Sequence, residues 1–400
     1  MSSEVKGKVS IFEAQRILDS LRTGTVPIQY LELLTAGREF WIAAIEEDLS
    51  FISQGASKIR FVSAHYGGGK THFLNLIKKE AFSKNFVVAY VELNSRESPM
   101  DKFETIFPKI MRNIEISQSE NGLESVFDHW TQNFKVYDRH EIEKNLKEIA
   151  PSMDFRAALR SYLEFAGLDA PESKDHLLAI LGWICGNKLT SGFTLKTGIR
   201  NPISIANVSE VFGSFLRFIR HNGFSGLLLL LDEAEAVTSL SHSQRRNEAN
   251  QNIRKLLDNA DNHLGFYIIF ATTPRFLTDP NVGAKSYPAL WDRIKDVLDL
   301  NMRLPNKRAL IIPLQPLQKK DLVKIGGIIS SIHGIAYNWD VKSKFTTNEI
   351  RRYVEQFQDK SEEQLVRTFI RGLVSLLDIA EQNPHIDLLQ EINNIVFTSA

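Results

Sequence analysis

The clearest chemical signal in the sequence is the eight-residue segment Ala64-His65-Tyr66-Gly67-Gly68-Gly69-Lys70-Thr71. In glycine loops of this type, successive backbone N–H groups converge on phosphate oxygens, a lysine adds a cation and a hydroxyl reaches Mg²⁺. We expect ATP and Mg²⁺ to bind here, with Lys70 on the phosphates and Thr71 on the metal ion. The candidate nucleotide-binding residues are Ala64, His65, Tyr66, Gly67, Gly68, Gly69, Lys70, Thr71 and the following His72.

The residues that flank this loop support the prediction. Residues 59–62 form an apolar run typical of a strand, and Phe73, Leu74 and Ile77 share one face of a predicted helix. A strand, a glycine loop and a helix in that order form a phosphate cradle. The loop departs from the usual pattern at Ala64, where glycine is expected, but alanine is small enough to be tolerated. The alternative is a glycine-rich surface turn, which the flanking patterns disfavour.

A second chemical signal lies far along the chain, where five leucines at 227–231 run into Asp232-Glu233-Ala234-Glu235. Such a run is typical of a buried parallel strand. Carboxylates at the carboxyl end of a central strand lie beside the phosphate loop in open α/β sheets. We therefore assign Asp232 to the Mg²⁺ shell and Glu233 to the attacking water, which it would orient or deprotonate. Taken alone, the segment also fits a core strand that ends in a solvated acidic turn.

A polar residue at the end of another predicted strand is a candidate sensor. Residues 266–271 are rich in β-formers and are followed by Thr272-Thr273-Pro274. A side chain at that strand end could hydrogen-bond the attacking water or the γ-phosphate. We favour Thr273 over Thr272 for this catalytic role.

Two arginines complete the set of candidate catalytic residues. Arg293 ends the helix predicted over 287–295, from where it could reach a nucleotide bound by a neighbouring subunit and neutralise charge on the transferring phosphoryl group. The alternative is a surface ion pair with Asp292 or Asp296. Arg367 shares a helix face with Arg371 in the C-terminal segment and is the preferred contact to the phosphates from there.

These residues require an α/β fold of the P-loop NTPase type, with a parallel sheet at its core. Far more residues separate Lys70 from Asp232 than a minimal nucleotide-binding core needs, so a helical insertion is expected at about 100–207. We predict N-terminal helices over 1–50 packed on the core, the ATPase core with its insertion over 51–318, and a helical lid over 319–400.

Composition restricts the class of protein. The 400 residues are 43% hydrophobic and carry 48 basic against 48 acidic side chains, which gives no general affinity for nucleic acid. No apolar stretch is long enough to span a bilayer, and the first residues lack the apolar core of a signal peptide. A single cysteine, Cys185, excludes an internal disulfide. We expect a cytoplasmic protein that does not bind membranes.

The order of these elements resembles an AAA+ ATPase of the initiator-like branch. Several separated motifs are more specific and resemble the ATP-binding proteins of BREX-type phage-defence operons. The motifs are Gly37-Arg38-Glu39, Tyr66-Gly67-Gly68-Gly69-Lys70-Thr71-His72-Phe73-Leu74, Leu181-Gly182-Trp183-Ile184-Cys185-Gly186, Asn222-Gly223-Phe224-Ser225-Gly226 and Val366-Arg367-Thr368-Phe369-Ile370-Arg371.

The resemblance implies a cytoplasmic prokaryotic ATPase that works with other defence proteins, often a helicase-like one, around invading DNA. A homo-oligomer in which Arg293 completes a neighbour's site is the leading hypothesis, with DNA bound directly or through the partner. A slowly hydrolysing, ATP-dependent signalling switch or scaffold is the alternative. A superfamily-two helicase is disfavoured, because the residues after Thr273 read as mainly helical and leave no second RecA-like domain.

Overall fold

The computed structural model describes residues 9–117, 122–134, 138–166, 171–258, 264–295, 305–357 and 365–393. The chain forms two compact units. The first unit is built from Met1–Ala43, Ala64–Leu76 and Pro313–Ala400, and the second unit from Ala44–Ser63 and Ile77–Ile312. No helix in the described ranges is both long and apolar enough to cross a bilayer.

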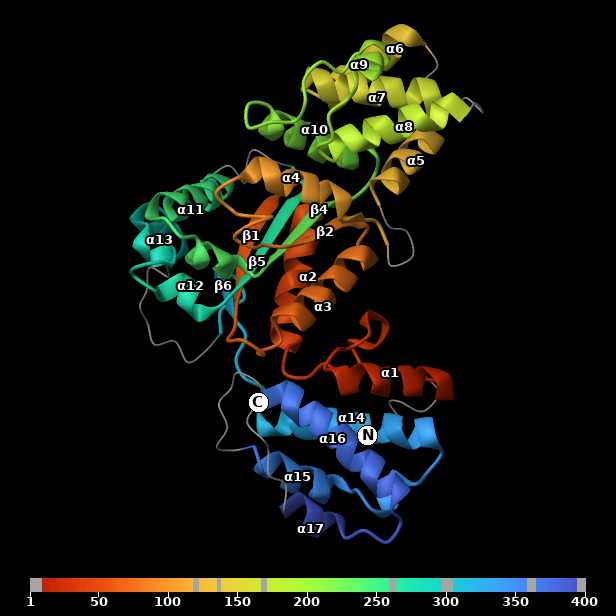
Figure 1. The fold of residues 1–400 in the computed structure, drawn as a ribbon, viewed down its shortest axis with the longest axis vertical. Helices are drawn as coiled ribbons and strands as arrows, with labels where there is room; N and C mark the ends of the chain where they lie inside the picture. The colour runs from red at the N-terminus through yellow and green to blue at the C-terminus, as the bar shows by residue number, and fades with distance from the viewer. Residues whose placement is uncertain are drawn as a thin grey trace. The chain divides into compact units, whose positions relative to one another are not determined.

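A six-stranded sheet with the strand order β3-β2-β4-β5-β1-β6 organises the second unit (Figure 1). Its central pairs, β1 with β5, β5 with β4 and β4 with β2, are parallel, and β3 adds an antiparallel edge. The predicted α/β fold with a parallel core is therefore confirmed. The strands are β1 Ser57–Ser63, β2 Phe86–Glu92, β3 Ile114–Glu115, β4 Gly226–Asp232, β5 Phe266–Thr272 and β6 Ile311–Pro313.

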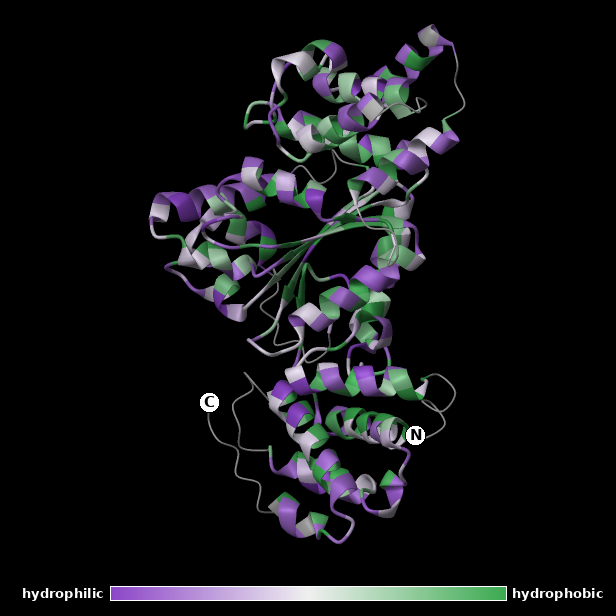
Figure 2. Ribbon diagram, turned by 45° about the vertical axis from the view of Figure 1, so that its right-hand side comes forward, coloured by the Kyte–Doolittle hydropathy of each residue, from purple (hydrophilic) through white to green (hydrophobic). Residues whose placement is uncertain are grey.

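The sequence of the central strands explains their place in the sheet. Every residue of β4 and of β5 is buried, and Figure 2 shows these strands as hydrophobic. Strands covered on both faces need continuous apolar runs, which the leucines at 227–231 supply. The two-residue β3 is too short to carry a recognisable pattern and was not predicted.

Helices fill the long interval between β2 and β4, as the sequence predicts. In Figure 1, helices α5 to α10 gather into one bundle. Aromatic rings form much of its core, since Phe127 lies 4.8 Å from Tyr162 and 4.9 Å from Phe218 between ring centroids. The helices of this interval are α4 Phe103–Arg112, α5 Leu123–Asn133, α6 Arg139–Ile149, α7 Met153–Ala166, α8 Pro171–Ile184, α9 Ser191–Thr197 and α10 Val208–His221.

A buried ion pair holds the helix that carries Asp48, α2 (Glu39–Ser53), on the sheet of the second unit. Asp48 accepts two hydrogen bonds from Arg60 of β1, at 2.8 and 2.9 Å, and one from the hydroxyl of Tyr267 of β5, at 2.6 Å. Arg60 is 1% exposed, so the several donors around Asp48 are needed to offset the cost of burying both charges. Burial raises the pKa of Tyr267 well above its usual value, which keeps the phenol protonated as a donor.

The remaining helices of the second unit follow β4 and β5, and two longer helices are divided between the units. Those after β4 and β5 are α11 Ser243–Asp258, α12 Pro274–Thr278 and α13 Pro288–Ile294, with the short turns η2 Ala234–Ser239 and η4 Ala284–Ser286. The divided helices are α2 Glu39–Ser53 and α3 Lys70–Ser83.

Within the described ranges, five helices form most of the first unit, and α1 packs against α14 and α16. Its core contains Ile17 and Leu21 of α1 with Ile329, Ile332 and Leu373. The sequence pattern did not indicate this long-range packing of the N-terminal helix. The helices are α1 Ile11–Thr23, α14 Lys319–Tyr337, α15 Thr347–Glu355, α16 Leu365–Gln382 and α17 Leu388–Asn393, with short turns η1 Ile28–Tyr30 and η5 Val341–Ser343.

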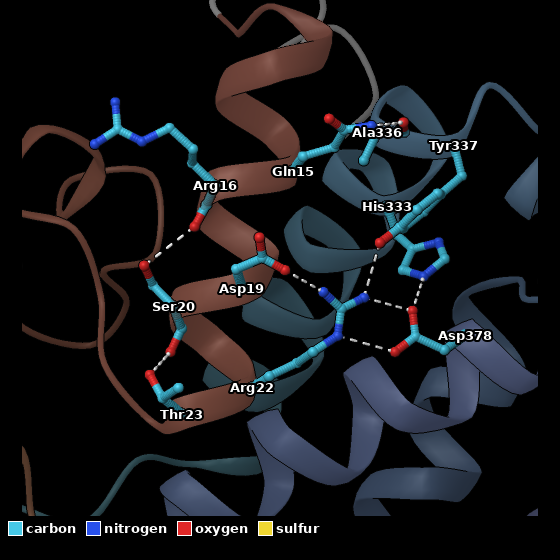
Figure 3. A network of polar contacts seen from close by, with 10 residues as sticks. All are labelled: Gln15, Arg16, Asp19, Ser20, Arg22, Thr23, His333, Ala336, Tyr337 and Asp378. Atoms are coloured by element: carbon cyan, nitrogen blue, oxygen red, sulfur yellow. Dashed lines mark hydrogen bonds and ion pairs between the residues drawn. The ribbon is translucent and has the colours of Figure 1, made fainter.

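A polar network joins α1, α14 and α16 within the first unit (Figure 3). Arg22 donates to both carboxylate oxygens of Asp378, at 2.7 and 3.1 Å. His333 is fully buried and lies 3.0 Å from the same carboxylate through Nε2, while Trp339 donates to its Nδ1 at 2.9 Å. Because indole N–H only donates, Nδ1 must be an acceptor. Neutral His333 therefore carries its proton on Nε2 and donates it to Asp378.

We predict that Asp378→Asn lowers the free energy of unfolding by about 1 to 3 kcal/mol, because it breaks a half-buried, charge-assisted contact to Arg22. The matched control is Asp19→Asn. Asp19 pairs with the same guanidinium at 2.6 Å but is 75% exposed, so the loss should stay below about 0.5 kcal/mol. Urea denaturation of both variants gives the comparison, and equal losses would show that Asp378 does not stabilise the helix contacts.

The same network predicts how stability depends on pH. Burial lowers the pKa of His333, against the opposing effect of Asp378. The folded chain therefore binds fewer protons than the unfolded chain below about pH 6.5, and this contribution to stability, complete above that pH, is lost as the pH falls. In Trp339→Phe, Nδ1 is released to take a proton. The loss of unfolding free energy between pH 7.5 and 5.5 should be smaller in this variant than in the wild type; an equal or larger loss would contradict the assignment.

Candidate functional site

The glycine loop leads from β1 into α3 and belongs to the first unit. Gly67 and Gly69 adopt φ of +74° and +87°, a region that L side chains rarely occupy. At Gly68, an added Cβ would lie 2.9 Å from the Cβ of Ala64 and 3.0 Å from the carbonyl oxygen of His65. Glycine is therefore required at all three positions, and the alanine that replaces the usual first glycine is accommodated because Gly68 has no side chain.

Lys70 begins α3 with its side chain folded back on the loop. It is 6% exposed, its ammonium lies 3.4 Å from the carbonyl oxygen of Ala64 and 4.9 Å from the ring centroid of Tyr66. A cation over an aromatic face is stabilised by the ring quadrupole. The ammonium is therefore held between the carbonyl oxygen of Ala64 and the ring of Tyr66, which is itself 56% exposed.

The two residues after Lys70 lie in different surroundings. Thr71 is exposed at the first turn of α3. His72 lies 2.9 Å from the hydroxyl of Thr35 through Nε2, and that hydroxyl donates to the carbonyl of Leu31. His72 must therefore donate from Nε2. Burial lowers its pKa to about 4, with a smaller effect from the positive charge of Arg38, and the ring stays neutral at physiological pH.

Arg38 contacts the glycine loop, although no chemical role was predicted for it. Its guanidinium donates to the carbonyl of Gly68 at 3.2 Å and to the carbonyl of Gln315 at 2.7 Å. The side chain is 7% exposed, and burial lowers its pKa against the attraction of Asp321. The motif Gly37-Arg38-Glu39 was the available signal. Arg38 therefore connects the glycine loop to the segment that precedes α14.

Gly37 shows why the residue before Arg38 must be small. Its φ is +68°, and a Cβ there would lie 2.8 Å from Oδ2 of Asp321. That oxygen also caps α14, where it accepts from the backbone N–H of Gln318 at 3.0 Å. Gly37 thus allows the chain to pass close to the first turn of α14 and brings Arg38 to the loop.

The acidic residues lie at the carboxyl end of β4 in the second unit. Asp232 is 2% exposed, and each of its carboxylate oxygens has a donor. Oδ1 accepts from the backbone N–H of Glu233 at 2.8 Å, and Oδ2 accepts from the hydroxyl of Tyr90 at 2.5 Å. Glu233 adopts φ 56° and ψ 38°. This left-handed conformation costs a non-glycine residue of order 1 kcal/mol or more and is typical of residues held for function.

Strand register places further polar residues at the same edge of the sheet. Thr272, the last residue of β5, is opposite Ser63 of β1, and Asp232 is opposite Glu92 of β2. Because β5 pairs with both β1 and β4, its end lies between theirs. Thr273 follows immediately, is 6% exposed and precedes α12 as its N-cap. Thr272 is completely buried, and its hydroxyl has no hydrogen-bond partner within the described ranges.

The two candidate arginines occupy separate places. Arg293 on α13 forms an ion pair with Asp258 and donates to the carbonyl of Ala289 at 2.7 Å. Neither carboxylate named in the sequence analysis is its recorded partner: Asp292 pairs with Lys295 at 2.6 Å, and Asp296 lies outside the described residues. The hydrogen bond from Arg293 is the main reason that the pKa of Asp258 is lowered.

Arg367 is exposed on α16 in the first unit. Its side-chain stem and that of Arg371 both pass over Gly24, at 3.9 and 3.8 Å from the position that a Cβ would take. This confirms only that the two arginines share one helix face. Any contact of Arg367 with phosphate stays a prediction.

Comparisons with known proteins give matches of very different extent. Endophilin-A3 of Rattus norvegicus is 38% identical over 77 residues, which is 18% of this chain and 21% of that protein. Endophilin-A3 of Homo sapiens is 36% identical over 77 residues, with the same coverage. The chain thus spans about a fifth of the length of these curated relatives. A solved Walker-type ATPase of Pyrococcus abyssi matches 90% of this chain and 71% of its own, at 13% identity and a TM-score of 0.38.

A family model covers nearly the whole sequence. The model for the BREX system ATP-binding protein BrxC/D matches residues 9–395. This range includes the glycine loop, the acidic end of β4, the helical insertion and the C-terminal helices. The chain therefore belongs to the BrxC/D family of BREX system ATP-binding proteins.

Proposed function

We propose that this protein is a Mg²⁺-dependent ATPase of the AAA+ type that converts ATP and water to ADP and phosphate within a BREX phage-defence system. Membership of an ATP-binding family supports the nucleotide. The observation that carries the hydrolytic assignment is the end of β4, where a buried, doubly hydrogen-bonded Asp232 is followed by Glu233 in a strained backbone conformation.

In this proposal the loop binds the triphosphate. The N–H groups at 67–71 contact phosphate oxygens, and Lys70 leaves its carbonyl and aromatic contacts to meet the β- and γ-phosphates. His65, Tyr66 and His72 are the further loop residues proposed near the nucleotide. His72 acts through the packing of α3, since its Nε2 donates to Thr35.

The donor set suits Mg²⁺, which prefers carboxylate, hydroxyl and water oxygens. Each oxygen of Asp232 accepts a hydrogen bond, which fixes the direction of a carboxylate of the type that a hydrated Mg²⁺ ion takes as a ligand. We propose that Thr71 and Asp232 hold the ion, which would neutralise charge on the phosphates when bound. Glu233 then orients and deprotonates the attacking water, and Thr273 hydrogen-bonds that water or the γ-phosphate.

The wider assembly follows the family assignment and is part of the same proposal. The protein would act in the cytoplasm as a homo-oligomer, with a helicase-like partner from the defence operon and with DNA bound directly or through that partner. We propose that 319–400 serves as a helical lid, with Arg367 reaching the phosphates, and that 51–318 forms the ATPase core with its insertion at about 100–207.

One observation favours the alternative of a slowly hydrolysing switch. Arg293, the residue proposed to act on a neighbour's nucleotide, is paired in its own chain with Asp258. As long as that ion pair persists, Arg293 cannot stabilise the charge on the transferring phosphoryl group. Turnover would then be slow until an assembly event releases Arg293 from Asp258.

Nucleotide binding is tested first with Lys70→Ala. We expect the affinity for Mg·ATP to fall by at least about 100-fold, which corresponds to losing a charged contact worth about 3 kcal/mol. Lys79→Ala, on the same helix α3, removes an equal charge outside the loop and should bind as the wild type does. Isothermal calorimetry measures both. Unchanged affinity in Lys70→Ala would exclude the proposed nucleotide site.

The role of Arg293 is tested against that of its ion-pair partner. Arg293→Ala should preserve ATP binding and lower turnover by about 1,000-fold at protein concentrations that favour assembly, because the charge supplied in trans is lost. Asp258→Asn removes this ion pair, together with the one from Arg254, and releases Arg293, so turnover should be kept or increased. If both variants lose turnover equally, Arg293 acts only through its contact with Asp258. Steady-state phosphate release distinguishes the two cases.

A further inference from the structure

Tyr90 on β2 reaches the carboxylate of Asp232 on the neighbouring strand. Its hydroxyl donates to Oδ2 at 2.5 Å, whereas Oδ1 accepts from the backbone N–H of Glu233 at 2.8 Å. The two donors approach different oxygens of one carboxylate. The rotation of the Asp232 side chain about its terminal bond is therefore fixed from both sides.

The strand register accounts for this contact. Tyr90 is paired with Leu230, and Glu92 with Asp232, so Tyr90 and Asp232 are diagonal neighbours on one face of the parallel pair. The side chain of Tyr90 is long enough to bring its hydroxyl to Oδ2 of Asp232 across this diagonal. Tyrosine supplies both the length and a hydroxyl donor at its end.

A carboxylate that meets a hydrated Mg²⁺ must have one lone pair aimed at the metal-bound water. Partners that orient a metal-binding group from outside the coordination shell typically change metal affinity by about 10- to 100-fold when they are removed. The backbone N–H of Glu233 contacts Oδ1 of Asp232, and the hydroxyl of Tyr90 contacts and orients Oδ2.

We propose that Tyr90 is a positioning residue for Mg²⁺: its hydroxyl holds Asp232 in the orientation that binds the hydrated ion accompanying ATP. The proposal rests on the proposed function of Asp232 as a metal residue. It gives β2, a strand outside the glycine loop and the acidic segment, an indirect part in metal recognition. Tyr90 contacts neither nucleotide nor water in this role and acts through Asp232.

The test is a titration of Mg²⁺ against the wild type and Tyr90→Phe at a fixed ATP concentration, with calorimetry as the readout, and a parallel ATP titration in EDTA. Phenylalanine keeps the ring and removes only the hydroxyl. We expect the Mg²⁺ concentration at half-saturation to rise about tenfold or more in Tyr90→Phe, while ATP affinity in EDTA stays as in the wild type.

Tyr162→Phe is the matched control. The Tyr162 hydroxyl donates to Oδ1 of Asp128 at 3.0 Å between α7 and α5, far from β4 in sequence, and its ring is buried. The variant loses an equivalent tyrosine–carboxylate hydrogen bond, so it should keep the wild-type Mg²⁺ midpoint. In an Asp232→Asn background, the additional effect of Tyr90→Phe on the midpoint should vanish, because the two residues act as one unit.

The outcomes separate this inference from the proposed function. A Tyr90→Phe midpoint within twofold of the wild type overturns the inference, and so does an equal loss of ATP affinity with and without Mg²⁺, which would indicate a structural role. A wild type that binds ATP with no dependence on Mg²⁺ overturns the metal role of Asp232 itself. A wild type that binds no ATP overturns the proposed function, and the inference with it.

Discussion

The shared edge of a parallel sheet is the constraint on which the rest of the structure depends. Parallel strands deliver their carboxyl ends to one edge, and here that edge receives Ser63, Glu92, Asp232 and Thr272 in fixed register. The chain enters the glycine loop directly from Ser63. Because β5 lies between β1 and β4, the threonines that end it lie between the strand that leads into the loop and the strand that carries the acids.

Buried polar contacts then fix the direction of each group. In the first unit, Arg38 donates to the carbonyl of Gly68 and orients the glycine loop. In the second unit, the hydroxyl of Tyr90 donates to Asp232 and orients its carboxylate. Polar groups are costly to bury unless they are hydrogen-bonded. Arg38 donates to two main-chain carbonyl oxygens, and Tyr90 donates to a carboxylate. Residues outside the glycine loop and the acidic segment therefore determine how the residues of those two segments are held.

Local pattern was sufficient to predict the main features of the sheet. The leucine run at 227–231 and the loop from Ala64 to Thr71 each have a periodicity and composition that few structures can accommodate, so β1, α3 and β4 lie where they were expected. The short β3 was missed because two residues are too few to show the alternation of apolar and polar residues that indicates a strand. The ion-pair partner of Arg293 was also missed, since Asp258 lies on a different helix and no sequence spacing connects them.

Long-range contacts explain what else sequence could not supply. Pairing of Tyr90 with Asp232 depends on the register of β2 against β4, which are separated by the whole helical insertion. Packing of α1 on α14 and α16 joins opposite ends of the chain. The apolar faces of these helices do not show from the sequence which helix packs against which. Arg38 was visible as part of a motif, but its role required the position of Gln315.

The most direct test of the central claim is steady-state ATP hydrolysis by the purified protein and its Glu233→Gln variant, with Mg²⁺, across protein concentration and with or without duplex and single-stranded DNA. Glutamine retains the shape of Glu233 but accepts no proton. The account predicts turnover by the wild type and its loss in the variant, with ATP still bound by both. Equal turnover in the two proteins would contradict the account, because hydrolysis would then not depend on the residue that follows Asp232 at the end of β4.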